Sequence, residues 1–238
     1  MTPPTSTETA LPTEPPKDFD GWWQAPGAWV EEPNERRNGW SGMMRLRIGD
    51  TLYYIKKQCN HLCRTLDHPF GWPTASRERV NIGRLQALGL SVPKPVFHGE
   101  RKSAEGYEAV LVTEELAGFL ALDTQTGLDS AARAALATET GRMLGIMHRA
   151  GWQHSCLYDK HIMVRWDNDR PLVALIDLEK LRKPLLPGKA ARHDLEQLKR
   201  HQRVWSETEW QILLSAHENQ AQAPDLPKNA ARQVYLRV

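Results

Sequence analysis

The chain has 238 residues, of which 40% are hydrophobic and 25% are charged, a balance typical of a globular protein with one large domain or two lobes. The formal net charge of only +2 argues against nucleic acid as the main partner. The three cysteines are too few for a disulfide framework. The first 20 residues lack the apolar core of a signal peptide, and no window suits a transmembrane helix, so we expect a cytoplasmic protein.

Basic residues gather locally at residues 45–47, 180–183 and 199–203. Such clusters usually form a solvated face of a protein. A cluster that serves an anionic substrate, or peripheral contact with the inner membrane, is the alternative that the sequence leaves open.

The N-terminal part predicts two different segments. Residues 1–18 are rich in Pro, Thr and Glu and are expected to be disordered, because little of that surface can be buried. Phe19 and three tryptophans then fall within residues 19–30. We expect this Trp-rich leader to be covered, by packing on the first lobe in preference to a partner.

Residues 43–48 and 51–57 predict a β-hairpin around Gly49-Asp50, and residues 39–42, G-W-S-G, predict a turn before it. Backbone amides of that turn could approach phosphates, although a plain turn explains the glycines equally well. The second strand ends in Lys56-Lys57, whose side chains must point to opposite faces, so only one can enter a ligand site.

Residues 75–88 have the apolar spacing of a helix that ends at Gly89, with Glu78 near its start. Residues 96–98 and 107–113 are the next predicted strands. Three further helices are predicted at residues 129–150, from residue 190 onward, and at residues 209–217.

Residues 154–179 organise the rest of the chain. Two apolar runs, residues 162–164 and 172–176, flank a D-N-D turn and predict a two-stranded hairpin. Such a hairpin brings the polar stretch that precedes it, H-S-C-L-Y-D-K-H, to the same edge as the residues that follow it, Asp177 and Glu179.

This arrangement resembles the catalytic loop and the metal loop of protein kinases, H-R-D-L-x-x-x-N followed by D-F-G. In that comparison His154 and Leu157 match the histidine and leucine, His161 stands at the asparagine, and Asp177 is the metal aspartate. Cys156 stands where kinases have the aspartate that accepts the proton of the acceptor hydroxyl.

The resemblance implies an α+β, bilobal protein-kinase-like fold. The N-lobe, residues 19–115, would hold a small antiparallel sheet and one helix, and the C-lobe, residues 116–238, would be mainly helical. It also implies nucleotide contacts for four residues: Lys56, Glu78, Glu114 and Leu116, of which the last two lie in an adenine-binding hinge. Asp194 would lie buried under the catalytic loop, or serve only as an acid in a first helical turn.

Several stretches taken together resemble the lipopolysaccharide kinase (Kdo/WaaP) family, and within it the InaA-like branch. They are Y-Y-I-K-K, E-R-V-N-I-G-R-L-Q-A-L-G-L-S-V-P-K-P, H-S-C-L-Y-D-K-H-I-M-V, L-I-D-L-E-K and R-H-D-L-E-Q-L. The resemblance covers about residues 35–205. It implies transfer of phosphate from ATP, with Mg²⁺, to heptose or Kdo sugars of the lipopolysaccharide core or another small or lipid-linked hydroxyl acceptor. The InaA-like branch also suggests a link to stress.

The resemblance implies metal ligation by Asp177, His161 and Glu179, whereas the cysteine at position 156 leaves two hypotheses open. In the first, Asp159 or His154 replaces the missing base and the protein is a kinase. In the second, the protein is a pseudokinase that binds a nucleotide or acts as a scaffold without transfer.

Overall fold

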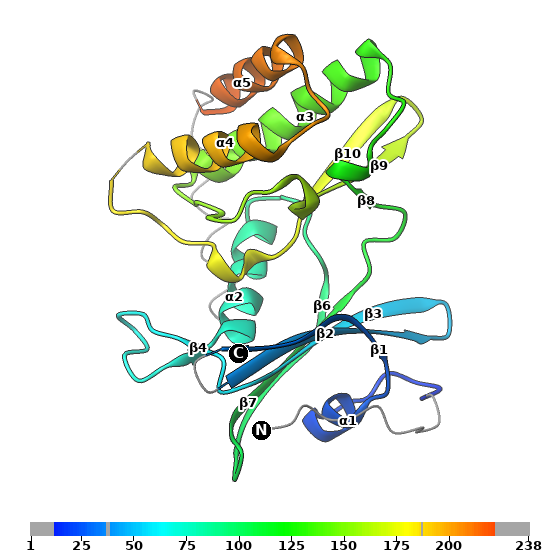
Figure 1. Cartoon of the computed structure of the whole chain (residues 1–238), viewed down its shortest axis with the longest axis vertical. Coiled ribbons are helices and arrows are strands. Elements are labelled where there is room, and N and C mark those ends of the chain that lie inside the picture. Colours follow the sequence, from blue (N-terminus) through cyan, green and yellow to red (C-terminus); the bar gives the residue numbers. More distant parts are fainter. Residues whose placement is uncertain (1–11, 37–38, 187, 222–238) are drawn as a thin grey trace. The chain divides into compact units, whose positions relative to one another are not determined.

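The computed structural model describes residues 12–36, 39–186 and 188–221 (Figure 1). Within these ranges the chain forms two compact units, one of the described residues up to 80 together with 93–116, the other of residues 81–92 together with the described residues from 117 onward. From the sequence we predict a lobe boundary between residues 115 and 116, with residues 81–92 in the first lobe, whereas in the structure residues 81–92 belong to the second unit. Of the segment predicted to be disordered, residues 1–11 lie outside the described residues.

The first unit is built on a five-stranded antiparallel sheet with the order β1-β2-β3-β7-β6. Its strands are β1 (Ala28–Arg36), β2 (Gly39–Ile48), β3 (Thr51–Cys59), β6 (Pro95–Ser103) and β7 (Gly106–Glu114). The second unit is mainly helical, so the α+β class predicted from the sequence is confirmed.

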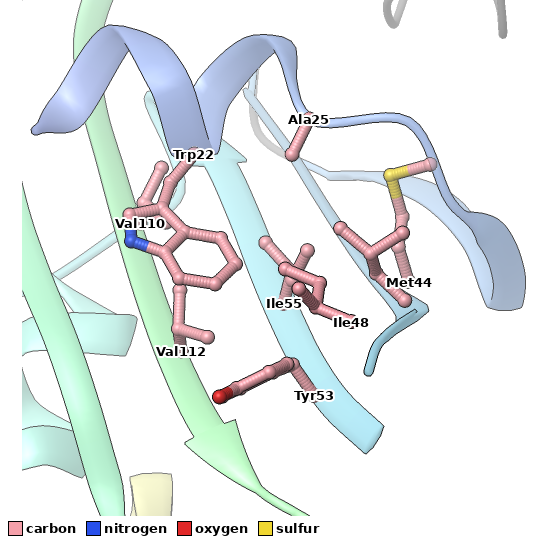
Figure 2. Packing of buried hydrophobic residues seen from close by; sticks show 9 residues of the cluster. Trp22, Ala25, Met44, Ile48, Tyr53, Ile55, Val110 and Val112 are labelled. Carbon is pink, nitrogen blue, oxygen red and sulfur yellow. The ribbon is translucent and has the colours of Figure 1, made fainter. Parts of the chain in front are cut away.

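The Trp-rich leader covers one face of this sheet, as predicted. Its helix α1 (Phe19–Gln24) is capped by Asp18, whose side chain accepts a hydrogen bond from the Gly21 amide at 2.8 Å. Trp22 is 1% exposed and packs among aliphatic side chains of β3 and β7, including Ile55, Val110 and Val112 (Figure 2). The leader is therefore part of the hydrophobic core of the first unit.

The turn predicted at residues 39–42 is wrong, because these residues form the beginning of β2. A Cβ at Gly39 would collide with the backbone of Asn60, and one at Gly42 would lie 2.6 Å from the Trp29 ring. The glycines serve close packing within the sheet. The sequence pattern does not predict strand β1.

Between β3 and the helix of the first unit the chain forms a small hairpin of β4 (Leu62–Cys63) and β5 (Trp72–Pro73). Helix α2 (Thr74–Gln86) follows directly and confirms the predicted helix near residues 75–88. Its first half belongs to the first unit, and its second half, from Asn81, belongs to the second.

The second unit places helices beside a small three-stranded sheet with the order β10-β9-β8 (Figure 1). Its strands are β8 (Leu120–Ala121), β9 (Ile162–Asp167) and β10 (Arg170–Leu175), and its α-helices are α3 (Ser130–Arg149), α4 (Lys189–His201) and α5 (Glu207–Ala221). Single 3-10 turns span Leu122–Thr124, Asp159–His161 and Leu178–Lys180. The hairpin predicted around D-N-D is β9–β10.

Helices α3 and α5 approach each other closely because two glycines lie one turn apart on α3. A Cβ at Gly145 would lie 2.6 Å from the carbonyl oxygen of His217, and one at Gly141 would collide with the carbonyl oxygen of Leu213. Only glycine allows this backbone contact, which fixes the position of α5 in the second unit.

Within the described part of the chain, none of the helices combines the length and the apolar character that crossing a bilayer requires.

Candidate functional site

The first group of candidate residues lies on β3 and α2. Lys56 and Glu78 form an ion pair with 2.8 Å between Nζ and Oε2, and both side chains are nearly buried, at 12% and 11% exposure. Alternation along β3 places Lys56 on the face that carries Gln58, which hydrogen-bonds Thr74 at the start of α2. The predicted pairing of this lysine with this carboxylate is therefore present in the structure.

Lys57 points the opposite way, into the core beneath α1. It is 2% exposed, and its ammonium group donates a hydrogen bond of 3.0 Å to the carbonyl oxygen of Ala25. Burial lowers the pKa of Lys57 to about 8. The geometry thus separates the two lysines: Lys56 is the one that can meet a phosphate on the α2 side.

The predicted adenine-binding segment begins at the end of β7. The amide of Glu114 donates to Lys94 O at 2.9 Å, and the amide of Glu115 donates to Leu52 O at 2.8 Å. The Glu114 carboxylate also pairs with the Lys94 ammonium at 2.8 Å. Among the described residues, Leu116 is the first in this segment whose amide has no backbone hydrogen bond. That amide is therefore able to contact an adenine ring.

The second group of candidate residues lies in the second unit, on the loop that precedes β9. Asp194 on α4 is fully buried beneath this loop and accepts hydrogen bonds from the amides of His154, at 2.6 Å, and Ser155, at 3.0 Å. Gln197, one turn later, accepts the amide of Leu157 at 2.9 Å. The prediction that Asp194 lies buried beneath this loop is confirmed, and Gln197 adds a further hydrogen bond to the loop backbone.

Two histidines continue this network away from the loop. His148 Nε2 lies 3.2 Å from Asp194 Oδ2, and His148 Nδ1 lies 2.9 Å from His217 Nε2 on α5. Burial raises the pKa of Asp194, but the hydrogen bonds from His148 and from the loop amides outweigh it and hold that pKa below its ordinary value. Asp194 is therefore a carboxylate whose charge is shared among buried donors.

His154 joins the loop to the end of β10. Its Nε2 donates to the carbonyl oxygen of Ile176 at 3.0 Å, and its Nδ1 is buried without a hydrogen-bond partner among the described residues. The side chain has no exposed surface, and burial lowers the pKa of His154. This geometry favours the role of a neutral residue that positions the loop. It does not favour the role of a base that exchanges protons with an acceptor.

His161 and Asp177 are brought together as the hairpin argument predicted. His161 Nδ1 donates to the carbonyl oxygen of Cys156 at 2.7 Å, which leaves Nε2 with a lone pair. That Nε2 lies 3.5 Å from Asp177 Oδ2. A histidine whose second nitrogen donates to a backbone carbonyl is the usual arrangement at metal sites, because the bond fixes the tautomer and the ring orientation.

These two side chains suit a divalent cation with few protein ligands. When an octahedral ion binds its ligands at about 2.1 Å, adjacent ligand atoms lie roughly 3 Å apart. This is close to the 3.5 Å between His161 Nε2 and Asp177 Oδ2. Among the described residues there is no group of three or more His, Cys, Asp or Glu side chains placed to hold a metal. Mg²⁺ commonly takes one or two carboxylates together with waters and substrate phosphates. The metal role of Glu179 stays a prediction.

The backbone around Asp177 is held in an uncommon conformation. Asp177 has a left-handed φ of 57° and precedes the 3-10 turn Leu178–Lys180. Asn81, on the second half of α2, donates to the carbonyl oxygens of Leu178 at 2.7 Å and Leu181 at 3.3 Å. These two hydrogen bonds fix the turn, and the turn fixes the direction of the Asp177 carboxylate.

The thiol that replaces the expected base has a cation as its neighbour. Cys156 is 8% exposed, and the Lys180 ammonium forms a hydrogen bond with its thiol, which raises the pKa of Lys180 above its ordinary value. Asp159 is partly exposed, and its Oδ1 accepts the amide of Lys160 at 3.0 Å. The structure therefore shows a lysine beside Cys156 and shows Asp159 bound to its own turn.

Several residues of this site were not predicted. They are Asn81, His148, Gln197 and Lys180. Lys180 belongs to a basic cluster noted in the sequence, whereas the other three carry no local signal, because their partners lie 40 or more positions away.

Comparison with known proteins gives a consistent result. Residues 20–217 match the family described as "Lipopolysaccharide kinase (Kdo/WaaP) family". Protein InaA of Escherichia coli (strain K12) is 35% identical over 201 residues, covering 82% of this chain and 92% of InaA. The structure of WaaP in complex with acyl carrier protein aligns with a TM-score of 0.62 and 23% identity, over 80% of this chain and 79% of that one. The likeness to WaaP supports the kinase-like fold expected from the sequence.

Proposed function

Because the chain belongs to the lipopolysaccharide kinase (Kdo/WaaP) family, we propose that it is an ATP-dependent phosphotransferase that acts on a hydroxyl group. A sugar of the lipopolysaccharide core, or another small or lipid-linked alcohol, is the proposed acceptor. The observation that carries the proposal is the prearranged pair His161 and Asp177, with the tautomer of the histidine set by its bond to Cys156 O. We place the reaction in the cytoplasm, where ATP is found.

In the first unit, Lys56 is proposed to contact the phosphates of ATP. Its ion pair with Glu78 holds the ammonium group in one direction, so less side-chain entropy is lost when a phosphate binds. The backbone at Glu114 and Leu116 is proposed to contact the adenine, which requires hydrogen bonds but no particular side chain.

In the second unit, Asp177 and His161 are proposed to hold the metal ion. A bound divalent cation supplies neutralisation of the charge on the transferring phosphoryl group. Imidazole is a better ligand for borderline metals than for Mg²⁺, so we expect Mn²⁺ to bind at least as tightly as Mg²⁺.

The transfer step joins the acceptor oxygen to the γ-phosphorus as the bond to ADP breaks, and the acceptor loses its proton to solvent or to a nearby base. General-base assistance is typically worth about 10² to 10⁴ in rate, and the thiol of Cys156 is a poor replacement for a carboxylate. Lys180 beside it adds positive charge, which can stabilise negative charge on the phosphoryl group. We therefore propose slow transfer that rests on positioning and charge, with Asp159 as the nearest carboxylate in sequence.

The presence of Lys180 beside Cys156 also favours a second candidate function. A cation beside the position of the expected base disfavours uptake of a proton there, so the chain could bind nucleotide and metal without transferring phosphate. Such a pseudokinase would share every nucleotide contact proposed above.

Thermal unfolding with ATP and each metal tests the nucleotide site. A ligand at one hundred times its Kd should stabilise the fold by about 2.7 kcal/mol. We expect a metal-dependent shift that Asp177→Ala and Lys56→Met remove, whereas Lys102→Met, a change of an exposed lysine in the first unit, retains it. No shift at millimolar ATP in the wild type would refute nucleotide binding.

The two candidate functions separate in a second experiment. Cys156→Asp restores the carboxylate, so a kinase should hydrolyse ATP or phosphorylate an acceptor sugar about 10²-fold faster or more. If the protein is a pseudokinase, the wild type and Cys156→Asp should both bind ATP, and neither protein should hydrolyse ATP or phosphorylate an acceptor. Cys63→Ser is the control, because Cys63 is only partly buried and lies in the first unit, so the second unit stays unchanged. Cys59→Asp is unsuitable because Cys59 is buried in the sheet.

A further inference from the structure

The segment between the metal loop and α4 exposes two large apolar side chains. Leu185 is fully exposed and Leu186 is 54% exposed. Adjacent leucines in water are costly unless something covers them, and adjacent exposed apolar residues commonly mark a contact surface. They lie within one short loop and project from it.

Cations surround these leucines on both sides. From position 180 to position 193 the sequence has no Asp or Glu. Lys180 is engaged with Cys156, so four exposed basic residues can make contacts outside the protein: Arg182, Lys183, Lys189 and Arg192. The leucine pair therefore lies between positive charges without a compensating carboxylate in the same segment.

The loop is held at both ends. On one side, Arg182 and Gln153 exchange two backbone hydrogen bonds, of 2.8 and 3.0 Å, and the Lys183 ammonium lies 4.7 Å from the centre of the Trp152 ring. On the other side, the amide of Lys189 donates to Leu186 O at 3.3 Å. The exposed leucines therefore lie on a loop that is anchored at both ends by these contacts.

A second loop with exposed apolar residues offers a comparison. Leu66 and Phe70, in the loop between β4 and β5, are 101% and 95% exposed. The charged residues of that loop are Arg64 and Asp67, so the net charge of the loop is zero. Each of these two loops exposes a pair of large apolar side chains, but of the two only the loop that carries Leu185 and Leu186 combines them with a uniform positive charge.

We propose that residues 182–186 and 188–192 dock the protein on an anionic lipid bilayer, with Leu185 and Leu186 inserted among the acyl chains and the flanking cations on lipid phosphates. Exposed apolar residues between basic ones are the pattern of interfacial membrane binding. An acidic protein would also attract the cations, but an anchored loop that projects two leucines with cations on each side matches the layered chemistry of a bilayer surface. The proposal does not rest on phosphate transfer.

Flotation with lipid vesicles tests this docking on the full chain without nucleotide. The vesicles contain phosphatidylcholine alone or phosphatidylcholine with phosphatidylglycerol, at low and at high salt. We expect binding to the anionic vesicles only, weakened by salt. Leu185→Ser with Leu186→Ser should lower binding about tenfold or more, because each buried leucine contributes strongly to partitioning. Arg182→Gln with Lys183→Gln should lower it roughly fivefold per charge.

Two matched variants serve as controls. Leu66→Ser removes an equally exposed leucine from the first unit, and Lys199→Gln with Arg200→Gln removes two cations from the far end of α4. Both should float nearly as the wild type does, and far-ultraviolet circular dichroism should match for all variants. If the wild-type protein does not float with anionic vesicles, the proposal is overturned in favour of a protein partner. Equal binding by the Leu185/Leu186 variant, or by both vesicle types, overturns it as well.

Discussion

Replacement of Lys57 by methionine should stabilise the protein near neutral pH. The side chain is 2% exposed, lies under α1, and makes one hydrogen bond, to Ala25 O. Its pKa falls from 10.5 to about 8 in the folded protein. Since one pKa unit corresponds to about 1.4 kcal/mol, keeping the charge in this site costs the fold about 3 kcal/mol. Loss of the hydrogen bond offsets about 1 kcal/mol of the gain.

The sign of the effect depends on pH. Below pH 8 the lysine is charged in both states, so the folded protein bears the whole cost. Between pH 8 and 10.5 the folded protein releases the proton first, so the wild type gains stability as pH rises. Lys57→Met should therefore be more stable by about 2 kcal/mol at pH 7, and this advantage should disappear above pH 10.

Urea unfolding of both proteins at pH 7 and pH 10 measures this difference, and titration of all other groups cancels because both proteins share them. Lys102→Met, at an exposed position on β6, should stay within about 0.5 kcal/mol of the wild type at both pH values. The reasoning fails if Lys57→Met is less stable at pH 7, or if its difference from the wild type does not change with pH.

Three further outcomes follow from the second unit. Asp194→Asn should lower the free energy of unfolding by about 2 kcal/mol and speed hydrogen exchange at the two loop amides it accepts, since an amide has only one acceptor oxygen. Burial lowers the pKa of His217 to about 4, so the wild type should lose about 3 kcal/mol as pH falls from 6.5 to 4, and urea titrations of His217→Gln should show a flatter dependence. Gly141→Ala should cost about 1 to 3 kcal/mol because its Cβ meets Leu213 O, whereas Thr138→Ala on the exposed side of α3 should be nearly neutral in thermal unfolding.

Much of the site could be predicted because the relevant signals are local. The alternation of β3 separates Lys56 from Lys57, and the hairpin that starts after His161 must return Asp177 to the same edge. These are consequences of strand geometry that act within a few residues. Asp194 could be predicted only from the resemblance, because a first-turn acid gives the same local pattern.

The remaining features depend on contacts between distant positions. Strand β1 was not predicted because E-E-P-N-E interrupts the apolar alternation, and pairing with β2 supplies its hydrogen bonds despite two register irregularities. The direction of Lys180 toward Cys156 follows from a turn held by Asn81, about 100 positions earlier in the chain. Such a contact has no trace in the spacing of nearby residues.

The burial of Trp22 has a consequence for synthesis of the chain. Translation releases α1 first. Val110 and Val112, which help to cover Trp22, lie on β7, the last strand of the sheet to be made. The nascent leader therefore carries a tryptophan that is only partly covered until β7 has left the ribosome, and the core of this unit is complete only with its last strand. Chaperones that hold aromatic segments would recognise the leader during that interval, and a chain shortened at its start beyond α1 would leave the apolar face of the sheet open to aggregation.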